Sequence, residues 1–96
     1  EGQENFAAGE NIVILDVRTA NEFNQGHIPK ARNIDVLETD MFKQQIALLP
    51  KDKTYLLYCR SGKRSATALN LMKENGFANI KHLQKGFAGW DGEVQQ

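Results

Sequence analysis

The sequence predicts an α/β domain with a mainly parallel sheet, and two observations lead to this prediction. Short apolar runs rich in β-branched and aromatic residues recur along the chain, and segments with helical periodicity separate them. The 96 residues fit one domain, which we assign to residues 1–96 with its core at about residues 12–90.

The first half of the chain predicts two strands and a helix. Residues 12–15 (IVIL) read as a buried strand, and residues 31–34 (ARNI) as a weaker one. A helix is then expected from Thr39 or Asp40, either of which can cap its N-terminus, through Leu49, and Pro50 ends it.

The second half repeats this order. Residues 54–58 (TYLLY) and 80–83 (IKHL) read as strands on either side of a helix over residues 64–75. Gly76 and Phe77 predict a Schellman motif at the end of this helix, with Phe77 packing back on Met72. Ligands of open parallel sheets bind beyond the carboxyl ends of the strands, which directs attention to Asp16 and Cys59.

Composition excludes several kinds of partner. Twelve Lys and Arg residues balance twelve Asp and Glu residues, so net charge gives no support for binding nucleic acid. Apolar runs are about four residues long, whereas about 20 are needed to cross a bilayer, so we expect no membrane partner. The sequence starts at Glu1 rather than Met, which is compatible with a removed leader, and cytoplasm and periplasm both stay open.

The segment after the strand over residues 54–58 carries the chemistry: Cys59, Arg60, Ser61, Gly62, Lys63, Arg64 and Ser65. The free N–H groups and dipole of the following helix favour an anion, and three cations lie close to the thiol. Such surroundings lower a cysteine pKa to roughly 3.5–7.5. The small residues allow the backbone N–H groups to curl inward as a nest. We therefore expect Cys59 to be a nucleophile, with residues 60–65 forming the substrate-binding loop.

Other interpretations of this segment are less well supported. A buried, inert thiol is common, but three neighbouring cations would then have no task. A P-loop would need a glycine five residues before Gly62. One cysteine and two histidines, His27 and His82, show no metal-ligand spacing, so we expect no metal site and structural roles for both histidines.

Four segments, in order, resemble the rhodanese family. CRSGKRS (residues 59–65) is similar to its active-site loop, and DVRTANEF (residues 16–23) resembles its D-V-R-x-x-x-E-[FY] segment. GHIPKARNI (residues 26–34) and GFAGW (residues 86–90) resemble two further segments of that family. The resemblance implies a three-layer α/β/α rhodanese-like fold with a mainly parallel sheet of four to five strands. The count is open because only Glu1 to Asn11 precede the first predicted strand, and the family usually has an additional strand and helix there.

The resemblance also implies an activity. Cys59 would take a sulfur atom from thiosulfate or a similar donor and pass it, as a persulfide, to cyanide or a thiol. The implied partners are a small-molecule donor and a thiol acceptor, which a protein could also supply. No cofactor is implied, and we expect a monomer. Since the 96 residues hold one cysteine, discharge of the persulfide would be intermolecular.

The other matched residues are expected to support the site. Asp16 is expected to hydrogen-bond loop backbone, and Arg18 and Glu22, four residues apart, to pair or brace loops. Residues 26–29 are expected to form a turn in which His27 hydrogen-bonds locally. Trp90 is expected to lie in the core or at the edge of a lid.

Two rival functions stay open. Cysteine phosphatases and arsenate reductases use C-x5-R, but here Ser65 occupies that arginine position and Arg64 comes one residue earlier. A non-catalytic, rhodanese-like binding module is the other, although such modules usually lack the cysteine.

Overall fold

Four parallel strands form the sheet of this computed structural model, which describes residues 12–96. In chain order they are β1 (Ile12–Asp16), β2 (Arg32–Asn33), β3 (Thr54–Tyr58) and β4 (Ile80–His82), and their spatial order is β2-β1-β3-β4. The predicted strands and the parallel sheet are confirmed. The prediction about a further strand within Glu1 to Asn11 lies outside the described residues.

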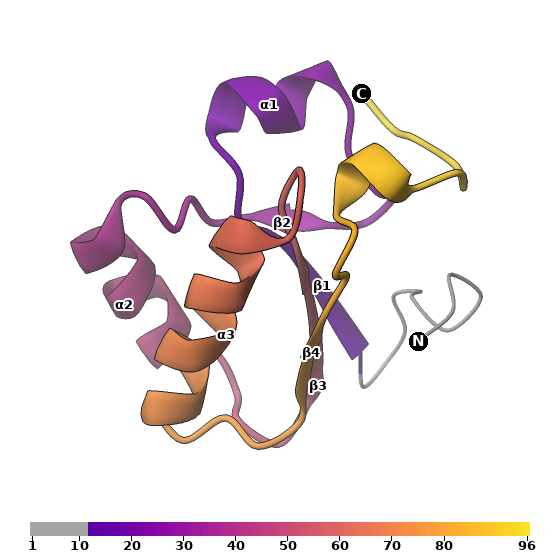
Figure 1. The fold of residues 1–96 in the computed structure, drawn as a ribbon. Coiled ribbons are helices and arrows are strands. Elements are labelled where there is room, and N and C mark those ends of the chain that lie inside the picture. The colour runs from indigo at the N-terminus through magenta and orange to yellow at the C-terminus, as the bar shows by residue number, and fades with distance from the viewer. Residues whose placement is uncertain (1–11) are drawn as a thin grey trace.

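Two long helices lie side by side on one face of the sheet, as Figure 1 shows. They are α2 (Thr39–Ala47) and α3 (Lys63–Glu74). The Schellman motif after α3 is confirmed, because Gly76 has φ +94° and the Phe77 N–H donates to the Met72 carbonyl at 3.1 Å. The predicted caps of α2 are wrong. Glu38 is its N-cap without a side-chain bond, and the Thr39 hydroxyl instead donates to the Val36 carbonyl at 3.3 Å. Within the described residues, no helix is long and apolar enough to cross a membrane.

One helix was missed by the sequence analysis, although its signal is present. Helix α1 (Ala20–Gln25) starts with a capping box, in which the Thr19 hydroxyl accepts from the Glu22 N–H at 3.3 Å. The Glu22 carboxylate in turn accepts from the Thr19 N–H at 3.1 Å. Thr19-x-x-Glu22 is the sequence signature of this cap. Helix α1 lies beyond the carboxyl edge of the sheet (Figure 1).

Alternation along the strands divides the core into two clusters. On the face covered by α2 and α3, Leu15, Tyr55 and Leu57 pack with Phe42 and Met72. The residues between them in the strands point to the other face. There Ile14, Leu56 and Tyr58 pack with Ile28 and Leu83, together with partly buried side chains that include Phe87 and Trp90. The 3-10 helix η2 (Phe87–Gly89) thus belongs to the second cluster.

Strand order places the functional loop. The chain leaves β1 toward the β2 edge and later returns to β3 on the opposite side of β1. The loops after β1 and β3 therefore diverge, and they open a crevice at the carboxyl edge of the sheet, where open α/β sheets bind ligands. Asp16 and Tyr58 are register partners at this edge, so Cys59 follows directly at the crevice.

Candidate active site

The Cys59 thiol lies at the base of a backbone nest. Its side chain is fully buried, and its Sγ accepts from the Gly62 N–H at 3.0 Å and from the Ser65 N–H at 3.4 Å. Gly62 is the N-cap of α3 with φ +101°, a left-handed conformation. A Cβ there would lie 2.2 Å from the Gln84 carbonyl oxygen, so only glycine lets the loop curl around the sulfur.

Two opposing effects act on the pKa of Cys59. Burial raises it by disfavouring the charged thiolate. Hydrogen bonds from the backbone and hydroxyl of Ser65, and from the backbone of Gly62 and Ser61, outweigh burial and hold the Cys59 pKa below its usual range. This direction agrees with the expected acidic thiol. The main stabilising groups are the N–H groups of the nest and the Ser65 hydroxyl, and the charge of Arg64 also interacts with Cys59.

The cations of the loop have separate positions. Arg64 binds the Glu22 carboxylate with both guanidinium Nη atoms, at 2.7 and 3.0 Å, which lowers the pKa of Glu22 to about 2. Arg60 and Lys63 are exposed. Of the two expectations for Arg18 and Glu22, the pairing with each other is wrong, because Arg18 pairs with a buried carboxylate instead. Their expected bracing of loops is confirmed, since Arg18 bonds to the Gly26 carbonyl and Glu22 to Arg64.

The carboxylate that pairs with Arg18 belongs to Asp16, which is fully buried with that arginine beneath the loops. The Arg18 guanidinium binds both Asp16 carboxylate oxygens, with Nη2 2.6 Å from Oδ2, and also donates to the Gly26 carbonyl at 2.7 Å. Asp16 additionally accepts from the Arg18 backbone N–H at 2.9 Å, so its expected bond to loop backbone is confirmed. The Asp16–Arg18 pair connects the end of β1 to the loop after α1. Within the described residues, it forms no hydrogen bond with the Cys59 sulfur.

The segment around η2 holds the cysteine loop from the other side. The Phe87 N–H donates to the Cys59 carbonyl at 2.7 Å, and the Ala88 N–H donates to the Arg60 carbonyl at 3.0 Å. Gly86 has φ +67°, and a Cβ there would lie 2.3 Å from the Arg60 carbonyl oxygen. The sequence analysis found this segment only as a matched motif and gave it no contact with the loop.

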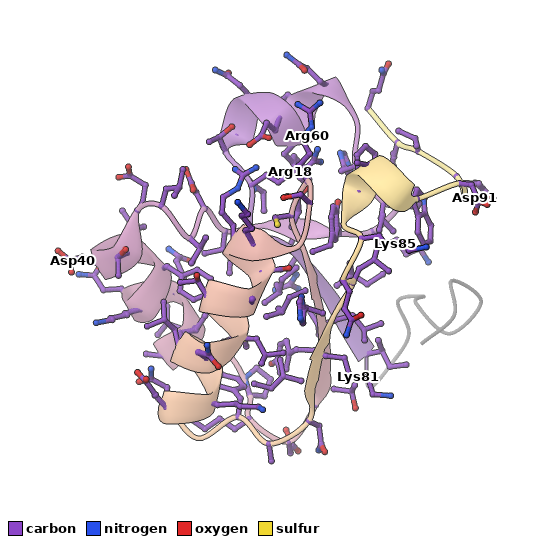
Figure 2. All side chains as sticks on the ribbon, in the orientation of Figure 1. Arg18, Asp40, Arg60, Lys81, Lys85 and Asp91 are labelled. Carbon is purple, nitrogen blue, oxygen red and sulfur yellow. The ribbon has the colours of Figure 1, made fainter. Side chains whose placement is uncertain are left out.

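An open cavity of about 320 Å³ borders the loop on the side of α1 and η2. Figure 2 shows Arg60 and Arg18 together in this region, at the carboxyl edge of the sheet. The cavity is lined by Arg18, Glu22, Gln25, Gly26, Arg60, Phe87 and Ala88. It gives a small anionic molecule room next to Arg60, the residue that follows Cys59.

The histidines and Trp90 also have defined positions. His27 stacks on Phe23 and its Nδ1 shares a 3.0 Å hydrogen bond with the Phe23 carbonyl, which confirms its local bonding. The His82 Nδ1 lies 2.9 Å from the Ser65 hydroxyl, a contact the sequence analysis missed because the two residues are 17 apart. Trp90 packs on the second core cluster and donates to the Glu93 carbonyl. Across residues 12–96, no group of three or more His, Cys, Asp or Glu side chains could hold a metal ion.

Comparisons with known proteins agree with this arrangement. The family model for the rhodanese-like domain matches residues 2–93. The uncharacterized protein YqhL of Bacillus subtilis is 37% identical over 94 residues, covering 97% of this chain and 72% of that protein. A sulfurtransferase of Allochromatium vinosum is 30% identical over 91% of this chain and 78% of its own length. The crystal structure of a rhodanese-related protein from Thermoplasma volcanium matches with a TM-score of 0.81 and 29% identity, covering 97% of this chain and 89% of that one.

Proposed function

This chain belongs to the rhodanese-like domain family, and we propose that it is a sulfurtransferase that carries sulfur as a persulfide on Cys59. Relatives named as sulfurtransferases associate the family with sulfur transfer in general. The observation that supports the persulfide proposal is the environment of the buried Cys59 Sγ. This sulfur accepts hydrogen bonds from the N–H groups of Gly62 and Ser65 at 3.0 and 3.4 Å. These donors stabilise a thiolate and supply an anion cradle.

In the first half-reaction the Cys59 thiolate attacks the outer sulfur of thiosulfate. A new S–S bond forms at Sγ while the donor's own S–S bond breaks, and its electron pair leaves with sulfite. Cys59 then holds a persulfide, and the N–H groups of Ser61, Gly62 and Ser65, which point to the sulfur, are the nearest donors for it.

In the second half-reaction an acceptor thiol or cyanide attacks the outer sulfur. The bond to Sγ breaks, and its electron pair returns to Cys59 as a thiolate. These 96 residues contain no other thiol, so no second cysteine within them can take up the sulfur. Neither half-reaction requires a metal or an organic cofactor.

Charge and space at the loop favour thiosulfate as the donor. Thiosulfate and the departing sulfite are compact dianions, and Arg60 and Lys63 are exposed at the loop. Arg60 also lines the adjoining cavity. Arg64 bonds to Glu22 instead, so we assign it a bracing role between α3 and α1 rather than substrate binding.

Cyanolysis of the purified protein with thiosulfate tests the proposal. Wild type should produce thiocyanate, and mass spectrometry after thiosulfate treatment should find one added sulfur atom. Cys59→Ser should lose both. Phosphate-monoester hydrolysis serves as the comparison for a cysteine phosphatase. Transfer that persists in Cys59→Ser, or a wild type that never gains sulfur, would refute the mechanism.

A further inference from the structure

The Ser65 hydroxyl lies between the nucleophilic sulfur and a histidine on the neighbouring strand. Its Oγ is 3.7 Å from the Cys59 Sγ and 2.9 Å from the His82 Nδ1. Ser65 and Cys59 are both fully buried, whereas His82 is half-buried at the end of β4. Within residues 12–96, the hydrogen bond that the structure shows for the His82 ring is this one to Ser65.

A serine hydroxyl has one hydrogen, so its direction depends on its neighbours. The Ser65 hydroxyl can donate to the Gly62 carbonyl at 3.1 Å. That oxygen also accepts from the Ala66 N–H at 3.1 Å, and its two lone pairs allow both bonds. Three acceptors therefore compete for the hydroxyl hydrogen: this carbonyl, the Cys59 thiolate, and the His82 Nδ1 when that nitrogen carries no hydrogen.

We propose that His82 is a positioning residue that acts on Cys59 through Ser65. With a hydrogen on Nδ1, the ring donates to the Ser65 Oγ, which makes the hydroxyl a stronger donor. Its hydrogen then goes to the charged Cys59 thiolate rather than to the neutral Gly62 carbonyl. With Nδ1 bare, Ser65 donates to the ring and the sulfur loses that donor. The consequence for turnover rests on the proposed sulfur transfer, whereas the effect on the thiolate does not.

The hydrogen bond from the Ser65 hydroxyl matters most when the outer sulfur is transferred away from the Cys59 Sγ. During persulfide discharge, negative charge returns to the Cys59 Sγ, where the N–H groups of Gly62 and Ser65 and the Ser65 hydroxyl converge. Weakening one of these donors makes the inner sulfur a poorer leaving group. Loading should change less, because a more basic thiolate is also the stronger nucleophile.

The test compares His82→Leu, His82→Asn and the control Lys81→Leu. Asparagine keeps a donor and an acceptor near the position of Nδ1, whereas leucine removes both. Lys81 is the exposed preceding residue of β4, so its substitution reports general effects on the strand. The readouts are the midpoint of Cys59 alkylation against pH and the single-turnover rate of persulfide discharge.

In His82→Leu the Ser65 Oγ loses the Nδ1 donor, and its hydroxyl turns to the Gly62 carbonyl. The variant should therefore raise the alkylation midpoint and slow discharge by about three- to tenfold, the scale of one neutral hydrogen bond. His82→Asn should restore most of both, and Lys81→Leu should resemble wild type. In a Ser65→Ala background, His82→Leu should have little further effect, since the connecting hydroxyl is gone. Unchanged readouts in His82→Leu, or the full effect in the Ser65→Ala background, overturn the proposal.

A measurement on the unmutated protein guards against misfolded variants. Nitrogen NMR of the His82 ring should show a hydrogen on Nδ1 at a pH where Cys59 is a thiolate, and on Nε2 after Cys59 is methylated. If the His82 tautomer is the same with Cys59 as a thiolate and with Cys59 methylated, the proposal is contradicted. Because alkylation and NMR need no sulfur transfer, a shifted midpoint without cyanolysis would retain the His82 role and remove only the proposed function.

Discussion

Gly86 offers a sharp test of how the C-terminal segment supports the cysteine loop. In Gly86→Ala the new Cβ would lie 2.3 Å from the Arg60 carbonyl oxygen and 2.7 Å from the Cys59 carbonyl oxygen. Ordinary carbon–oxygen contacts start near about 3.3 Å, so the two segments must separate by about 1 Å. The obstructing atoms are backbone, and rotation of a side chain cannot relieve the contact.

The expected cost has two parts. A side chain at φ +67° costs about 1–2 kcal/mol, and forcing atoms into a packed contact adds about 1–3 kcal/mol. A chain of 96 residues has a total stability of about 5–15 kcal/mol, so the variant should still fold. A displacement of about 1 Å at a reacting group can lower a rate about 100-fold. We therefore expect large losses of Cys59 alkylation and of sulfur transfer per folded molecule.

Gly76→Ala is the matched control. Gly76 has a similar left-handed φ of +94°, but its Cβ would meet only the flexible Lys51 side chain, at 3.3 Å. The free energy of unfolding of Gly76→Ala, measured with urea, should fall by about 1–2 kcal/mol, and the alkylation rate of Cys59 should stay unchanged. If Gly86→Ala is no less stable than Gly76→Ala and reacts as fast as wild type, the reasoning from the close backbone contact is wrong.

Three further predictions concern the ionisable groups of the site. The Glu22 pKa is depressed from 4.5 to about 2, so its bond to Arg64 stabilises the fold above pH 4.5 and is lost as pH falls toward 2. Glu22→Gln keeps the capping signature and should lower the free energy of unfolding by about 1–2 kcal/mol at pH 7, after allowance for solvent screening. Urea unfolding measures this loss, and an equal loss at pH 7 and pH 3 would contradict the prediction. The alkylation rate of Cys59 should have its midpoint below the roughly 8.5 of a free thiol, and a midpoint at or above that value would mean that the nest does not hold an anion. Arg60→Ala combined with Lys63→Ala should raise the KM for thiosulfate several-fold with little change in kcat, and a higher wild-type kcat/KM for mercaptopyruvate would overturn the choice of donor.

Much of the fold could be predicted because its signals are local. The short apolar runs of the strands and the Gly76–Phe77 pair at the end of α3 are signals confined to a few neighbouring residues. The Thr19-x-x-Glu22 cap of α1 was equally readable and was overlooked. The cysteine loop could also be recognised, since its nucleophile, its small residues and the start of its helix are contiguous.

The partners of the site residues could not be predicted in the same way. Arg64 binds Glu22 across 42 residues, and Ser65 meets His82 across 17. From their spacing, Arg18 and Glu22 were expected either to pair or to brace loops. Burial of Asp16 beside Arg18 decides against that pair.

The sequence by itself determined the parallel α/β sheet and identified Cys59 as the candidate nucleophile. Strand periodicity and loop composition depend on neighbouring residues, which a sequence displays directly. The tertiary structure alone decided which donors lower the Cys59 pKa, where the loop cations lie, and that Gly86 and His82 border the site. These features arise where the strand order brings distant segments to one edge of the sheet, and contacts fixed by packing geometry leave no pattern in the local sequence.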